Sequence, residues 1–182
     1  MTTEQQAPTG AERRSRLRQY QVTLLERMQA AKAGTGNAGR ELGVLLGGRR
    51  CLLDLTQVGE IVPFQAVTAV PLSQDWYRGL SNIRGNLVGV VDLARYMGEA
   101  GTQPGPDSRL VTFATHLGFN VAILAGRVLG LRNLDEMVEE APADSGQAAW
   151  GGQQFKDREG QQWTRLDLGE LVRDARFLQI GL

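Results

Sequence analysis

The feature that most limits how this chain can fold is its series of short apolar runs. From Glu41 onward, runs such as 42–46, 51–55 and 86–91 are separated by turn-forming residues. Glycine, which tolerates the dihedral angles of tight turns, supplies 23 of the 182 residues, well above its usual share of about 7%. Short strands linked by tight turns predict a mainly β fold, as in small barrels and sandwiches.

The same pattern places the individual elements. The predicted strands are 42–46, 51–55, 66–71, 86–91, 110–114, 120–124, 128–134, 153–155 and 162–166. The predicted helical segments are a turn at 74–80, a short helix at 92–97 and a final helix at 168–177. Residues 135–147 are acidic and are predicted to form a loop.

Residues 1–40 follow a different pattern. Thr9 and Glu12 have the spacing of a capping box, which marks a helix start. The apolar face of the predicted helix consists of Leu17, Tyr20, Leu24 and Met28. Residues 34–39 match G-x-G-x-x-G, but they follow a helix, whereas a dinucleotide loop follows a strand. We therefore expect an N-terminal extension over 1–40, made of an amphipathic helix and a Gly-rich linker, and a β-rich domain over 41–182.

Composition excludes several classes of protein. Hydrophobic residues make up 42% of the chain, which is enough for a packed core. One cysteine and one histidine cannot build an internal disulfide or a His/Cys metal centre. No apolar run reaches the ~20 residues of a membrane span, and the N-terminus has no hydrophobic signal region. The prediction is a cytoplasmic protein without a metal or cofactor.

The charges are unevenly distributed. Residues 1–50 carry a net charge of +5 and residues 51–182 carry −5, so the whole chain is neutral. The β region would on average repel phosphate, which argues against nucleic-acid binding there. The acidic residues between Asp135 and Glu140 lack the pattern of a calcium loop and are interpreted as a solvated face. A remaining alternative is that the basic helix tethers the protein to a membrane surface or a nucleic acid.

A weak internal repeat points to two similar lobes. Residues 85–93 can be aligned with residues 160–168, and in both a turn glycine is followed seven residues later by Asp-Leu. The glycine would turn a hairpin, and the aspartates, Asp92 and Asp167, would cap the helices that follow.

No catalytic constellation stands out. His116 has no recognisable nucleophile or orienting acid, and Cys51 lies in an apolar run, as expected for a buried, inert thiol. The most distinctive stretch is 76–93, where an aromatic pair (Trp76 and Tyr77) precedes Arg84 in a turn that leads to an apolar strand. One interpretation is a helix–turn–strand connection with incidental arginines. The other is a protein-docking loop, because aromatic and arginine side chains are favoured interface anchors.

At this stretch the sequence resembles the CheW-like family. The pieces of the family signature occur in order at 42–46, 47–48, 51–55, 58–61, 70–71, 78–80, 82–85 and 90–93, and the resemblance extends over about 41–176. Gly89 stands where the family usually has proline, so we expect a looser strand there.

The resemblance implies two small five-stranded SH3-like β-barrels packed together along a hydrophobic seam, with short helices. It also implies a non-enzymatic adaptor of chemotaxis signal transduction, a scaffold in a two-component system. Its expected partners are the cytoplasmic tip of a methyl-accepting chemoreceptor and the regulatory domain of a CheA-type histidine kinase, with no nucleic acid and no membrane insertion. The added N-terminal helix and the divergence of the later strands, after about residue 125, are most similar to the type IV pilus (twitching motility) version.

The resemblance also supplies the candidate protein-binding residues, which are Val58, Glu60, Gly79, Asn82, Arg84 and Gly85. Arg84 and Glu60 are expected to form an ion pair that fixes the docking loop. Gly79 and Gly85 are interpreted as backbone positions that need unusual dihedral angles or close approach. Val58 is expected in an apolar patch at the receptor-binding groove.

One alternative comes from a different class of function. The chain could be a small-molecule-binding β-barrel, possibly an enzyme. That function would require a defined pocket with converging polar groups or groups of perturbed pKa.

Overall fold

The computed structural model describes residues 39–141 and 148–182. Its strands are β1 (Arg40–Leu46), β2 (Arg49–Asp54), β3 (Val58–Pro63), β4 (Tyr77–Ile83), β5 (Asn86–Val91), β6 (Arg109–Phe113), β7 (Val121–Ala125), β8 (Arg127–Asn133), β9 (Val138–Glu140), β10 (Gln153–Lys156) and β11 (Gln162–Leu166). Its helices are α2 (Leu93–Tyr96), α3 (Leu168–Leu171) and α4 (Ala175–Leu178). The predicted N-terminal helix, with its capping box, lies outside the described residues. In the parts that are described, no helix has the length and apolar character needed to cross a membrane.

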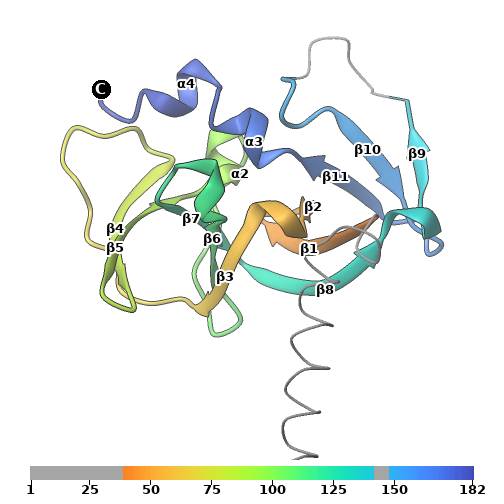
Figure 1. The fold of residues 1–182 in the computed structure, drawn as a ribbon, viewed down its shortest axis with the longest axis horizontal. Helices are drawn as coiled ribbons and strands as arrows, with labels where there is room; N and C mark the ends of the chain where they lie inside the picture. Colours follow the sequence, from red (N-terminus) through yellow and green to blue (C-terminus); the bar gives the residue numbers. More distant parts are fainter. Residues whose placement is uncertain (1–38, 142–147) are drawn as a thin grey trace, which may run out of the picture. The chain divides into compact units, whose positions relative to one another are not determined.

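The strands form two mixed sheets, which confirms a mainly β fold (Figure 1). The first lobe is a six-stranded sheet in the order β8-β1-β2-β11-β10-β9, and the second lobe is a five-stranded sheet in the order β3-β6-β7-β5-β4. The hairpins β1–β2, β6–β7 and β10–β11 form as predicted. The first lobe has one strand more than expected because the acidic residues at Val138–Glu140 pair with β10 as an edge strand.

The two sheets share one pairing pattern, which extends the internal repeat to whole lobes. Five strands of the first lobe, β8-β1-β2-β11-β10, correspond in order to β3-β6-β7-β5-β4. In each lobe the third and fourth strands are parallel and every other neighbouring pair is antiparallel. The two aligned segments become β5 and β11. Each belongs to the parallel pair of its lobe, β5 beside β7 and β11 beside β2.

The repeat also holds in its polar details. Asp92 and Asp167 cap α2 and α3, as predicted, each by accepting a hydrogen bond from a backbone amide three residues on. The backbone amides of the same aspartates donate to the carbonyls of Trp76 (2.8 Å) and Trp150 (2.7 Å). Each lobe therefore has a tryptophan in the same place, just ahead of β4 or β10.

A single apolar cluster joins the lobes, as the expected seam requires. It combines residues of β1 and β2 with residues of β6 and β7. At its centre are five aromatic side chains, Trp76, Tyr96, Phe113, Trp150 and Phe177. Phe177 of α4 stacks on Trp76, with ring centroids 5.5 Å apart, and on Phe113 at 6.3 Å. The C-terminal helix thus adds its aromatic side chain to the apolar cluster that joins the lobes.

The two lobes have the expected SH3-like arrangement, and among the described strands each sheet stays open at its edges rather than closing into a complete barrel. In the second lobe the chain beyond β3 nevertheless reaches the opposite edge. Thr68 and Leu80 exchange two backbone hydrogen bonds of 2.8 Å, and the Gln65 side chain donates to the Ser81 hydroxyl at 3.1 Å. These contacts bring the end of β3 close to β4 and curve the lobe.

Three local predictions are wrong. Residues 66–71 do not form a strand, because Thr68 alone makes a ladder contact and most of the segment is exposed. The predicted helical turn at 74–80 is limited to its start, where the Tyr77 amide donates to the Gln74 carbonyl at 3.0 Å, and residues 77–80 belong to β4, in which Gly79, Ser81 and Ile83 alternate inward. The final helix is divided into α3 and α4, because Asp174 caps a new helical turn.

The strand at Gly89 is regular, contrary to expectation. Gly89 pairs with Leu80 on one side and Val121 on the other. The Tyr77 ring fills the space beside it, since its hydroxyl oxygen would lie 2.9 Å from a Cβ at position 89. The aromatic ring takes the place of a side chain and keeps the strand packed.

Candidate functional site

The turn between β4 and β5 holds its arginine in an uncommon backbone conformation. Ile83 pairs with Asn86, which leaves Arg84 and Gly85 as a two-residue turn. Both have positive φ, +50° and +85°, the mark of a type I′ hairpin turn. The Asn82 side chain supports the turn by accepting a hydrogen bond of 2.8 Å from the Gly85 amide. Gly85 suits this turn, whereas an arginine with positive φ is strained.

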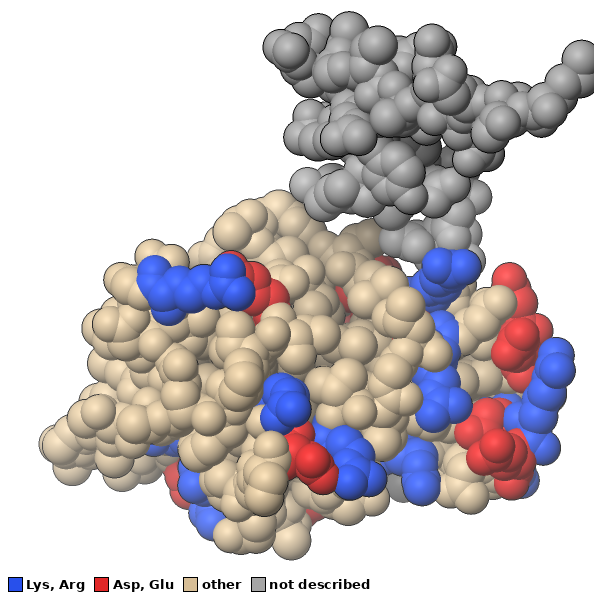
Figure 2. Space-filling model, turned by 90° about the horizontal axis from the view of Figure 1, so that it is seen from below, with Lys and Arg blue, Asp and Glu red and all other residues tan. Residues whose placement is uncertain are grey.

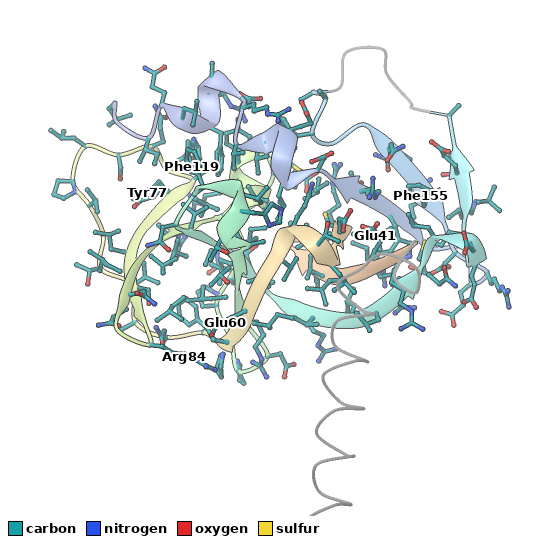
Figure 3. The ribbon with its side chains drawn as sticks, in the orientation of Figure 1. Glu41, Glu60, Tyr77, Arg84, Phe119 and Phe155 are labelled. Carbon is teal, nitrogen blue, oxygen red and sulfur yellow. The ribbon has the colours of Figure 1, made fainter. Side chains whose placement is uncertain are left out.

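Arg84 and Glu60 form the expected ion pair. The Arg84 Nε atom lies 3.1 Å from Glu60 Oε2, and the two side chains remain 74% and 52% exposed. Glu60 belongs to β3 and Arg84 to the turn after β4, which are the two edges of the five-stranded sheet. Figure 3 shows both side chains at the same end of this lobe. A pair this exposed contributes only about 0–1 kcal/mol, so its main effect is to fix geometry.

Uncharged side chains make up most of the side of the molecule seen from below (Figure 2). Figure 2 views the molecule from the side on which Figure 3 places Glu60 and Arg84, and most of the surface there is uncharged. Where charges do occur over the second lobe, basic and acidic side chains stand beside each other. We call the exposed surface of Glu60, Asn82, Arg84 and Gly85 the turn surface.

Two of the six candidate residues lie outside the turn surface. Gly79 is buried in β4 with φ of +126°, and a Cβ there would overlap the carbonyl group of Thr68. The close approach predicted at Gly79 is therefore made by the backbone of Thr68, which belongs to the same chain. Val58 is half-buried and packs against the apolar cluster that joins the lobes. Both residues shape the lobe rather than belonging to the turn surface.

The aromatic pair is not a set of exposed anchors. Trp76 is 5% exposed and contacts Tyr96 and Phe177 in the seam. Tyr77 is half-buried against Gly89. The docking-loop interpretation is thus wrong for the tryptophan, because the chain needs its apolar surface to join the lobes.

The remaining reactive residues are structural. Cys51 is fully buried, and burial raises the pKa of its thiol to about 12, so the nucleophilic thiolate is suppressed. His116 is exposed in the short 3-10 turn Thr115–Leu117. Within residues 39–141 and 148–182, no group of three His, Cys, Asp or Glu side chains is placed to hold a metal ion.

A buried ion pair lies in the first lobe. Glu41 is 2% exposed and pairs with Arg165 at 3.0 Å, which also reaches Asp54 at 3.4 Å. Burial raises the pKa of Glu41, although Arg165 beside it acts in the opposite direction. The three residues tie β1, β2 and β11 together and lie in the other sheet from the turn surface.

Sequence reasoning missed one residue that touches the turn surface from below. The Thr112 hydroxyl of β6 contacts the backbone of Glu60 on both its amide and its carbonyl side. A threonine in an apolar strand gives little signal by itself, and only the pairing of β3 with β6 reveals the contact.

Comparison with known proteins agrees with the two-lobed fold. A family model described as a CheW-like domain matches residues 41–176, about three quarters of the chain. Protein PilI of Pseudomonas aeruginosa is 26% identical over 129 residues, which are 70% of this chain and 69% of PilI. The crystal structure of the scaffolding protein TtCheW from Thermoanaerobacter tengcongensis matches with a TM-score of 0.60 and 19% identity, covering 71% of this chain and 88% of that one. The expected resemblance to the PilI type is confirmed, and the chain belongs to the CheW-like family of non-enzymatic scaffolding adaptors.

Proposed function

We propose that this adaptor couples the cytoplasmic tips of chemoreceptors to the regulatory domain of a CheA-type histidine kinase, and that it does so in the cytoplasm in type IV pilus (twitching) motility. Its family and the likeness to PilI support this assignment. The turn surface is the proposed docking site. Val58 and Gly79 act through the backbone, by holding β3 and β4 in position.

The conformation of Arg84 is the observation that carries the proposal. A type I′ turn favours Asn, Asp or Gly at this position, because these residues adopt positive φ at low cost. Arg84 instead combines positive φ with 74% side-chain exposure. Neither folding nor packing calls for an arginine here, so its guanidinium, held by Glu60, is best explained by contact with a partner.

The proposed role of Val58 is to hold the backbone of β3, which carries Glu60. Its side chain packs on the seam cluster two residues before Glu60. Val58→Ala is a better test than Val58→Asp, because a buried carboxylate would unfold the lobe and lower binding for that reason alone. A Val58→Ala variant that stays folded and binds like the wild type would remove Val58 from the site.

The decisive experiment measures binding and stability on the same variants. Arg84→Glu should weaken binding to the purified kinase regulatory domain or to a receptor cytoplasmic fragment by more than about tenfold, with an almost unchanged thermal midpoint. Arg158→Glu is the matched control, because Arg158 is an exposed arginine in the corresponding hairpin turn of the first lobe. Normal binding by Arg84→Glu, or its unfolding, would contradict the proposed docking site.

A further inference from the structure

The strand that carries Glu60 contains a bulge. Val58 of β3 pairs with Phe113 of β6, and Ile61 pairs with Val111. Gly59 and Glu60 therefore stand opposite one residue, Thr112. A bulge of this kind interrupts the backbone ladder and re-aims the side chains of the strand that contains it.

The Thr112 hydroxyl replaces the missing ladder bonds. Its oxygen accepts a hydrogen bond from the Glu60 amide at 2.6 Å and donates one to the Glu60 carbonyl at 3.3 Å. A hydroxyl group can do both at once, since it is donor and acceptor. Gly59 leaves room for this contact, because a Cβ there would lie 2.6 Å from the same oxygen and 2.9 Å from the Phe113 carbonyl oxygen.

The bulge decides where the Glu60 carboxylate points. In a strand, a shift of one residue moves every side chain to the opposite face of the sheet. With the bulge in place, Glu60 Oε2 reaches Arg84 Nε at 3.1 Å from the opposite edge of the lobe. Pairing without the bulge would change the direction of Glu60 and remove this contact.

We propose that Thr112 is a positioning residue of the turn surface, which holds the backbone of Glu60 and, through Glu60, the orientation of Arg84. The inference rests on the proposed docking function of the turn surface. The essential group is the hydroxyl: valine has the shape of threonine and cannot make either hydrogen bond, whereas serine keeps both.

The test compares Thr112→Val with Thr112→Ser, alone and together with Glu60→Ala, in the full chain. The first measurement needs no partner and is the hydrogen exchange rate of the Glu60 amide. We expect exchange about tenfold faster in Thr112→Val and near the wild-type rate in Thr112→Ser. The second measurement is affinity for the kinase regulatory domain and the receptor fragment. Here Thr112→Val should bind about tenfold more weakly, Thr112→Ser should restore binding, and Thr112→Val should add nothing in the Glu60→Ala background.

The outcomes separate this inference from the proposed function. Unchanged Glu60 exchange in Thr112→Val overturns the inference whatever the binding shows. Normal binding by Thr112→Val, while Arg84→Glu fails to bind, overturns the inference and leaves the docking site standing. Normal binding by Arg84→Glu itself contradicts the proposed function, and the positioning role in docking fails with it.

Discussion

Replacing Arg84 by asparagine should stabilise the protein while it weakens partner binding. A left-handed backbone conformation destabilises most L-residues by about 1–2 kcal/mol, and the destabilisation is much smaller for asparagine. Arg84→Asn relieves this strain at φ of +50° and places Asn-Gly, a favoured type I′ sequence, in the turn. The variant loses the ion pair with Glu60, whose exposure of 74% and 52% limits its contribution to about 0–1 kcal/mol. The expected net gain is about 1 kcal/mol.

This gain is measurable by urea unfolding and by thermal melting. We expect a higher urea midpoint with an unchanged m-value, and a melting temperature about 2–4 °C higher. Glu60→Gln is the matched control, because it removes the ion pair and keeps the strained arginine, and it should be neutral or slightly destabilising. If Arg84→Asn lowers stability by 1 kcal/mol or more, the ion pair carries much more energy than its exposure allows, and the reasoning from strain is refuted.

Three further predictions concern the scaffold. Phe177→Ala should cost about 3–5 kcal/mol in urea unfolding, because the ring is 1% exposed within the apolar cluster, and a loss below 1 kcal/mol would show that the cluster packs well without it. Gly79→Ala should destabilise by at least about 1–3 kcal/mol, since φ of +126° is strained for alanine and its Cβ would also overlap the Thr68 carbonyl, whereas Gly98→Ala, at φ of +83° with open space, should cost less. A hydrogen bond from the Trp163 indole holds the pKa of Asp157 below its usual 3.8, so its stabilising effect exists above that pH and is lost as pH falls through the lowered pKa. In urea titrations, the difference in free energy of unfolding between the wild type and Asp157→Asn should become smaller from pH 7 towards pH 3. A difference that stays constant with pH would contradict this cause.

The elements predicted well are those in which the local pattern and the tertiary role agree. The runs at Leu42–Leu46 and Cys51–Leu55 alternate with glycine turns, and they form the hairpin that was expected. Asp92 and Asp167 cap their helices because an N-cap depends on neighbouring residues only. The fold of the two lobes came from the resemblance to the CheW-like family rather than from these local patterns.

The elements that were missed depend on contacts far away in the sequence. β3 has no clean alternation, because its bulge places Gly59 and Glu60 together opposite Thr112. β9 is acidic and polar, and its backbone pairing with β10 alone makes it a strand. Trp76 was interpreted as an anchor because the sequence cannot show that Phe177, a hundred residues later, covers it. Each of these errors concerns a tertiary contact that overrides a local signal.

The order of strands in the two sheets allows the second lobe to form before the first during synthesis. The second lobe uses β3 to β7, a continuous stretch that is complete once Ala125 has been made. The first lobe places β2 beside β11, so its sheet stays unfinished until Leu166 has left the ribosome. Because domains form as their segments emerge, the lobe that carries Glu60 and Arg84 can fold first and present a template. The last strand and Phe177 then close the other lobe against it, so a chain truncated before β11 would expose the apolar seam to quality control.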